Sequence, residues 1–229
     1  TIRYDAIGNP LRYSNGNRWS FTWEHGRRLS QAEGNGCPLS FTYNDEGIRT
    51  SKTVNDVVHT YRLNGNQIVA EEWTTTDVNG TAVSHVLVYL YDAEGAPVGM
   101  QYRNQTYAAE VFDVYWYEKN LQGDIVAVYD NDGTPLIFYH YDAWGNIKTE
   151  HSDNWSASST ANLNPFLYRG YYYDSELGMY YLQSRYYDPV ICRFINPDTY
   201  LSTGQNIIGN NMYAYCINNP VLFSDLSGD

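Results

Sequence analysis

The sequence predicts an all-β fold, and three observations lead to that prediction. Tyrosine is the compositional outlier, with 24 of 229 positions, and it occurs together with 18 glycines. Aromatic rings pack well on a pleated sheet, and glycine supplies the positive φ that tight turns need. A short motif, Tyr-Asp-x-x-Gly, recurs along the chain, and strand-like apolar segments such as 86–91 and 125–129 lie between its copies. Long helices are not expected.

The motif predicts a series of β-hairpins over residues 1–150. Four well-preserved copies begin at Tyr4, Tyr43, Tyr91 and Tyr141, and degenerate copies lie at 23–27 and 61–66. In each copy we expect the aromatic residue to end a strand facing the interior, the aspartate to cap the turn and the glycine to take a positive φ. The first four glycines, at 8, 26, 47 and 65, are separated by 18, 21 and 18 residues. This spacing suits a hairpin of two short strands plus connections.

Charge and cysteine usage exclude several classes of function. The chain has 14 basic and 26 acidic residues, a net charge of −12, which disfavours nucleic acid as a partner. No segment approaches the ~20 apolar residues that a membrane span needs, and no signal-peptide pattern begins the chain, whose N-terminus resembles a cut edge. Cys37, Cys192 and Cys216 are few and widely spaced, so we expect free, mostly buried thiols, with no metal and no cofactor.

The last third carries motifs distinct from the hairpin repeats. Residues 151–164 are rich in Ser, Asn and Thr and predict an exposed loop. Five short motifs follow it: Tyr168-Arg169-Gly170, Gly178-Met179-Tyr180-Tyr181-Leu182, Arg185-Tyr186-Tyr187-Asp188-Pro189, Asn211-Met212-Tyr213-Ala214-Tyr215, and Asp225-Leu226-Ser227-Gly228.

With these repeats and motifs the chain resembles the YD-repeat or Rhs family over essentially its whole length, and residues 165–229 resemble the Rhs-associated core domain. The resemblance implies a curled or spiralling antiparallel sheet of hairpins, closed by a core domain with a short helix near residues 210–216. Members include secreted or cell-surface bacterial polymorphic toxins, whose shell encloses a C-terminal toxin. The expected partners are therefore the protein's own C-terminal toxin segment and upstream YD repeats, and this chain would be the terminal segment of a larger shell.

The resemblance further implies that the core domain cuts its own chain. Carried over by motif position, the catalytic residues would be Arg185, Asp198 and Asp225, with the cleavage site at Gly228 and Asp229. Two neighbouring carboxyl groups can share one proton, so that one activates water and the other acts as an acid, in an order that stays open. Arg185 would hold a carboxylate or stabilise oxyanion charge.

The same residues have structural alternatives. Without the resemblance, the two aspartates suit turns and Arg185 suits a salt bridge on a strand, as do the neighbouring Asp188 and Arg193. Two features depart from the family pattern: Thr199 and Leu226 stand where prolines are usual, and Asp229 stands where leucine is usual.

A second class of function is a non-catalytic carbohydrate-binding or adhesion module. Sugars stack on exposed aromatic rings, and six tryptophans are candidates: Trp19, Trp23, Trp73, Trp116, Trp144 and Trp155. Most aromatic residues of a β protein are packing residues, however. A glycosidase with paired carboxylates has no motif in this sequence.

Overall fold

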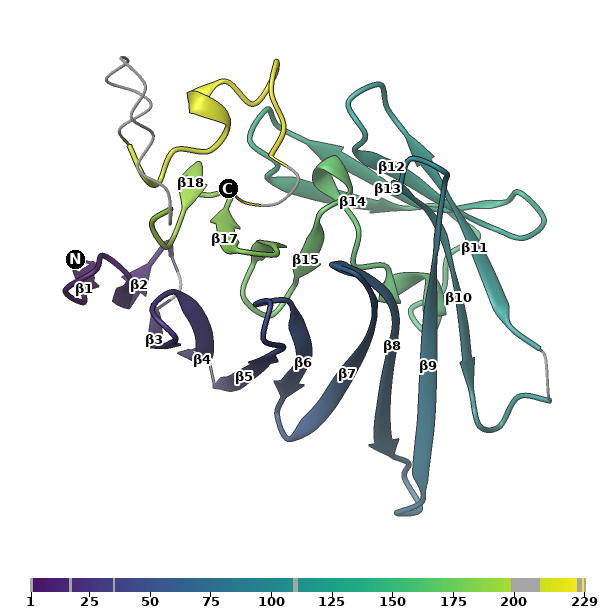
Figure 1. Cartoon of the computed structure of the whole chain (residues 1–229). Coiled ribbons are helices and arrows are strands. Elements are labelled where there is room, and N and C mark those ends of the chain that lie inside the picture. Colours follow the sequence, from purple (N-terminus) through teal and green to yellow (C-terminus); the bar gives the residue numbers. More distant parts are fainter. Residues whose placement is uncertain are drawn as a thin grey trace. The chain divides into compact units, whose positions relative to one another are not determined.

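The computed structural model describes residues 2–16, 18–34, 36–108, 111–198, 211–225 and 228. The chain divides into two compact units, each assembled from separate segments. The first combines residues 1–55, 143–146 and 171–229, and the second combines 56–142 and 147–170. The described residues are organised as antiparallel strands and contain no α-helix, which confirms the all-β prediction (Figure 1).

The first unit contains strands of two sheets. Six strands, each antiparallel to its neighbour in the chain, are β1 (Arg3–Tyr4), β2 (Pro10–Ser14), β3 (Arg18–Glu24), β4 (Arg28–Gly34), β5 (Cys37–Tyr43) and β6 (Arg49–Val54). A small sheet of four strands comprises β15 (Tyr172–Asp174), β16 (Met179–Leu182), β17 (Arg185–Asp188) and β18 (Arg193–Phe194). All residues of β16 and β17 are buried, so these two strands belong to the unit's core.

The second unit continues the same hairpin pattern. Its strands, again in chain order, are β7 (Val57–Asn64), β8 (Gln67–Thr76), β9 (Ala82–Tyr91), β10 (Pro97–Asn104), β11 (Asp113–Lys119), β12 (Ile125–Asp130), β13 (Pro135–Tyr141) and β14 (Ile147–His151). Two 3-10 helices follow, η1 (Thr160–Leu163) and η2 (Tyr168–Gly170). None of the helices in the described part of the chain is long and apolar enough to cross a membrane.

The predicted turn chemistry is confirmed in the hairpins. In the first copy, Asp5 Oδ1 accepts hydrogen bonds from the amides of Ile7 (3.0 Å) and Asn9 (2.8 Å), and Gly8 has φ +94°. Asn44 and Asp92 likewise accept from the amide four residues on, each at 2.8 Å. Because the acidic or amide side chain satisfies backbone donors within the turn, the motif specifies its own local geometry.

The structure contains further copies of this turn that were not predicted. A fifth full motif lies at 129–133, where Asp130 Oδ1 accepts from the amide of Thr134 at 2.8 Å and Gly133 donates to the Asp130 carbonyl. Asp77 and Asn120 cap the same turn without a preceding tyrosine. The turn therefore depends on the Asp or Asn and the glycine, and the aromatic residue has a separate role.

The aromatic residue of the motif makes a hydrogen bond to the neighbouring strand. The hydroxyls of Tyr43, Tyr91 and Tyr141 donate to the carbonyls of Leu29 (2.8 Å), Ile68 (2.5 Å) and Ile125 (2.7 Å). In one degenerate copy the indole Nε1 of Trp23 makes the equivalent bond to Pro10, at 2.7 Å. The expected inward-facing position is wrong for Tyr4, which is 40% exposed.

Two other expectations are corrected. The helix expected near residues 210–216 is absent from residues 211–215, which form a turn, an isolated bridge and a bend; residue 210 lies outside the described residues. Instead a 3-10 turn, η4 (Cys216–Asn218), follows, and the left-handed φ values of its three residues prevent an α-helix. None of the three cysteines forms a disulfide bond; Cys216 is buried, but Cys37 and Cys192 are only half-buried, so the expectation of mostly buried thiols is wrong.

Candidate active site

The candidate active site lies in the first unit, at the start of β17. Arg185 is the first residue of this strand, and its side chain is 5% exposed. Its guanidinium carbon lies 3.6 Å from the centroid of the Phe194 ring, and Nη1 donates to the Met212 carbonyl at 3.2 Å. A cation held over an aromatic face is fixed in orientation as well as position. The remaining guanidinium nitrogens therefore point in defined directions.

The structure brings the three predicted catalytic residues together. Arg185 Nη2 lies 3.1 Å from Asp198 Oδ2 and 3.5 Å from Asp225 Oδ2. The aspartate side chains are 17% and 13% exposed, so water reaches both carboxylates. The amide of Asp198 donates to the Met212 carbonyl at 2.8 Å, and the amide of Asp225 donates to the Tyr171 hydroxyl at 2.9 Å. Residues distant in the sequence thus meet at one guanidinium nitrogen.

Gly228 lies at the same place. Its carbonyl accepts hydrogen bonds from Ser184 Oγ (2.6 Å) and from Arg185 Nε, and its amide donates to Asp225 Oδ1 at 2.7 Å. Gly228 has φ +78°, and a Cβ atom here would lie 2.4 Å from the carbonyl oxygen of Leu182. The position therefore requires glycine. The other predicted cleavage-site residue, Asp229, lies outside the described residues.

Asp188 and Arg193 were expected to be structural partners, and each contacts side chains outside the candidate site. Asp188 Oδ2 accepts from the Tyr13 hydroxyl and from Asn15 Nδ2, both at 2.6 Å. Burial and the nearby carboxylate raise the pKa of Tyr13. The Arg193 guanidinium lies 4.4 Å from the centroid of the Tyr213 ring.

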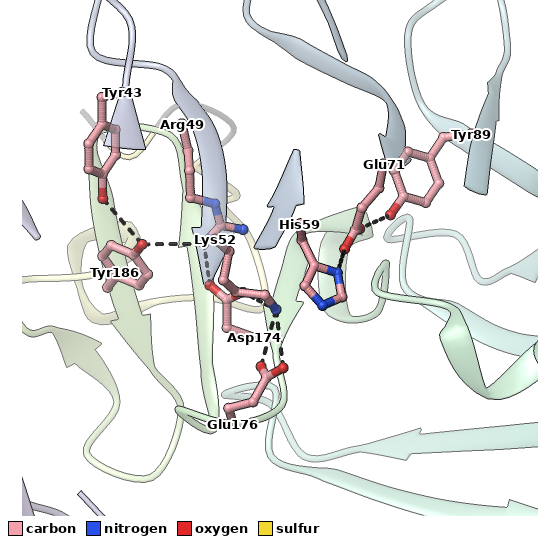
Figure 2. A network of polar contacts seen from close by, with 9 residues as sticks. All are labelled: Tyr43, Arg49, Lys52, His59, Glu71, Tyr89, Asp174, Glu176 and Tyr186. Carbon is pink, nitrogen blue, oxygen red and sulfur yellow. Dashed lines mark hydrogen bonds and ion pairs between the residues drawn. The ribbon is translucent and has the colours of Figure 1, made fainter. Parts of the chain in front are cut away.

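A second polar cluster of the first unit was not predicted (Figure 2). Arg49 and Asp174 are fully buried and form an ion pair at 2.5 Å, and Lys52 Nζ lies 3.1 Å from the other Asp174 oxygen. The Arg49 guanidinium also lies 4.2 Å from the Tyr181 ring centroid, and its Nη1 donates to the Tyr186 hydroxyl at 3.3 Å. Removing one partner of a buried ion pair is costly, so we expect the intact cluster to matter for the stability of the fold.

The second unit has its own polar and aromatic cluster, part of which is drawn in Figure 2. Glu71 accepts from the Tyr89 hydroxyl at 2.7 Å and lies 2.7 Å from His59 Nδ1. Trp73 stacks between His59 and His85, with ring centroids 5.2 and 5.0 Å apart. Burial, and after it the charge of His59, lowers the pKa of His85. Within the described ranges, no group of three or more His, Cys, Asp or Glu is placed to hold a metal ion.

The six tryptophans, all in the described part of the chain, differ in exposure. Trp19 is 2% exposed and belongs to the core, whereas Trp116 is 45% exposed. The other four are half-buried. Trp155, for example, stacks on His151 with centroids 3.7 Å apart. Most of the rings proposed for sugar stacking are thus engaged in packing.

The fold and the motifs define a YD-repeat shell segment, and the comparison with known families agrees. Residues 69–221 match the Teneurin YD-shell family, so the chain belongs to that family. The resemblance to YD-repeat proteins is thereby confirmed.

Two kinds of relatives share this segment. The tRNA nuclease WapA of Bacillus subtilis (strain 168) is 34% identical over 232 residues. The match covers 100% of this chain and 9% of WapA. The crystal structure of TcdB2-TccC3-TEV has a TM-score of 0.75 and 22% identity, over 99% of this chain and 11% of that one. The Tc holotoxin pore of Photorhabdus luminescens has a TM-score of 0.74 and 20% identity, over 98% and 10%. The structural likeness concerns the fold, and the chain spans only about a tenth of each relative.

Proposed function

We propose that this chain is part of the shell of a bacterial polymorphic toxin, which encloses a C-terminal toxin segment and releases it by aspartate-dependent self-cleavage. One observation carries the catalytic part: a single nitrogen of Arg185 lies within 3.5 Å of both Asp198 and Asp225. The chain leading out of the core is held at the same place, since Gly228 bonds to Arg185 and Asp225.

The chemistry is a single hydrolysis. One carboxylate takes a proton from water, whose oxygen then bonds to the carbonyl carbon of Asp229. The C–N bond to the next residue breaks, and the other carboxyl group donates its proton to the leaving amine. Either aspartate suits either role. Arg185 keeps both acids near the substrate and offers positive charge to the developing oxyanion.

The enclosing role is supported by the pattern of the strands and by the relatives. Strands that each pair with the next in the chain build a sheet that grows by repetition, and such a sheet, if curled, forms a wall around a cargo. We propose residues 165–229 as the core domain that closes it. WapA is named as a tRNA nuclease and TccC3 occurs in a toxin complex, which supports a toxic cargo and a secreted or cell-surface location.

The test uses the full natural protein that carries this chain, with an epitope tag at its C-terminus. The wild-type protein is expected to yield a discrete C-terminal fragment that begins after Asp229, as measured by mass spectrometry of the new termini. Asp198→Asn and Asp225→Asn are each expected to leave the chain intact. Asp153→Asn, at an exposed loop position, is the matched control and is expected to cleave normally. An intact wild-type chain at every pH would refute self-cleavage.

A further inference from the structure

The turn between β16 and β17 has an unusual backbone. Gln183 has φ +57°, and the amide of Ser184 donates to the carbonyl of Leu182, two residues before it, at 2.7 Å. A left-handed φ is unfavourable for a residue with a side chain and persists where the surroundings hold it in place. Such strained positions are concentrated at functional sites.

This turn forms a cradle for Gly228. Ser184 Oγ and Arg185 Nε both donate to the Gly228 carbonyl, across 44 and 43 positions of sequence. The position of the missing Cβ of Gly228 is 2.4 Å from the Leu182 oxygen, 3.0 Å from Ser184 Oγ and 3.2 Å from the Arg185 amide nitrogen. The backbone of Gly228 therefore lies directly against residues 182–185.

We infer that Ser184 is a positioning residue for the self-cleavage proposed above, on which this inference rests. Gly228 is held at both of its amide groups, by Ser184 and Arg185 at the carbonyl and by Asp225 at the N–H. Consecutive Cα atoms are about 3.8 Å apart, so fixing Gly228 limits how far the proposed scissile carbonyl, one residue further on, can move from the carboxylates.

The Ser184 hydroxyl is needed because it supplies a second hydrogen-bond donor to the Gly228 carbonyl beside Arg185. Arg185 Nη2 lies near Asp198 and Asp225, its Nη1 donates to the Met212 carbonyl, and its Nε donates to the Gly228 carbonyl. Without Ser184 Oγ the Gly228 carbonyl loses a hydrogen-bond donor, and the chain at Gly228 becomes more mobile. Misplacement of a reacting group by about 1 Å costs on the order of 100-fold in rate.

The first experiment measures the rate of fragment release from the full natural protein after synthesis is stopped. Ser184→Ala is expected to slow release about 10- to 100-fold, and Ser184→Thr, which keeps the hydroxyl, is expected to restore most of the rate. The pH dependence of the rate should keep its shape, because the acid and base are unchanged. Ser175→Ala, at an exposed position between β15 and β16, is the matched control.

Two outcomes overturn the inference while leaving the proposed function intact. Ser184→Ala could cleave at the wild-type rate while Asp198→Asn does not cleave. Alternatively, Ser184→Ala and Ser184→Thr could both be as inactive as Asp198→Asn, which would give Ser184 a chemical role instead.

A second measurement does not depend on cleavage. In uncleaved Asp198→Asn protein, hydrogen exchange at the Gly228 amide is expected to become faster when Ser184→Ala is added. An unchanged exchange rate would overturn the inference even if the wild-type protein proved unable to cleave itself.

Discussion

The carboxylate of Asp174 lies 2.5 Å from the guanidinium of Arg49, and neither side chain is exposed to solvent. The pair joins the first strand of the small sheet, β15, to β6 within the first unit. Arg49→Met should therefore lower the free energy of unfolding by about 3 kcal/mol, because a buried carboxylate loses its nearest cation while Lys52 remains. Urea unfolding of the chain measures this loss. Arg18→Met, at an exposed position of the same unit, should have little effect, and an equally small effect at Arg49 would contradict the prediction.

The tyrosines of the repeat should contribute through their hydroxyls. Tyr91→Phe removes the donor to the Ile68 carbonyl and keeps the ring, so the free energy of unfolding should fall by about 1 kcal/mol. Thermal or urea unfolding measures this loss of free energy. Tyr129→Phe is a suitable control, since that hydroxyl donates to the solvent-accessible carboxylate of Glu118. Equal effects of the two substitutions on the free energy of unfolding would show that the bond to the neighbouring strand does not stabilise the fold more than the exposed bond does.

Alkaline pH should destabilise the fold. Burial raises the pKa of Tyr139 from its ordinary value of 10.0 to about 12, although a bond to Asn164 opposes the shift. The folded state then holds a proton that the unfolded state releases, so the stabilising contribution is complete below pH 10 and is lost between pH 10 and 12. In Tyr139→Phe, the loss of stability per pH unit in that window should be smaller by about 1.4 kcal/mol. An unchanged slope in pH-dependent urea unfolding would show that this phenol titrates normally.

Gly228→Ala tests whether the close contact between Gly228 and residues 182–185 is needed for cleavage. The added methyl group would meet the Leu182 carbonyl, and φ is +78°, so the chain should leave the cradle and fragment release from the full natural protein should nearly stop. Gly36→Ala is the matched control, because Gly36 has φ +73° but no atom within 4 Å of the added Cβ. Cleavage of Gly228→Ala at the rate of the control would mean that close packing at Gly228 does not matter.

Local features of the fold were predictable because they rest on contacts between near neighbours. Asp5 and Asp92 bond to amides two to four residues away, so the motif carries its turn wherever it occurs. The bonds from Tyr91 to Ile68 and from Arg49 to Asp174 span 23 and 125 residues and leave no such pattern. The helix expected near residues 210–216 is absent from 211–215, and it cannot continue from there because Cys216, Ile217 and Asn218 all take left-handed φ.

The candidate site was predictable only through its motifs. Nothing in composition or spacing brings Arg185, Asp198 and Asp225 together; the resemblance to the Rhs core placed them, and their convergence depends on the tertiary structure. The contact of Ser184 was not predicted, because its partner Gly228 lies 44 residues away and a serine next to an arginine carries no signal for such a contact.

Strands that pair only with their immediate successors have a consequence for biosynthesis. Each new strand pairs with the strand translated just before it. The sheet can therefore assemble progressively as the polypeptide emerges, without pairing between strands that are distant in the sequence. The small sheet is translated after these hairpins and supplies the partners of Arg49 and Gly228. A nascent chain with this architecture would thus complete the candidate site only after the hairpins are in place.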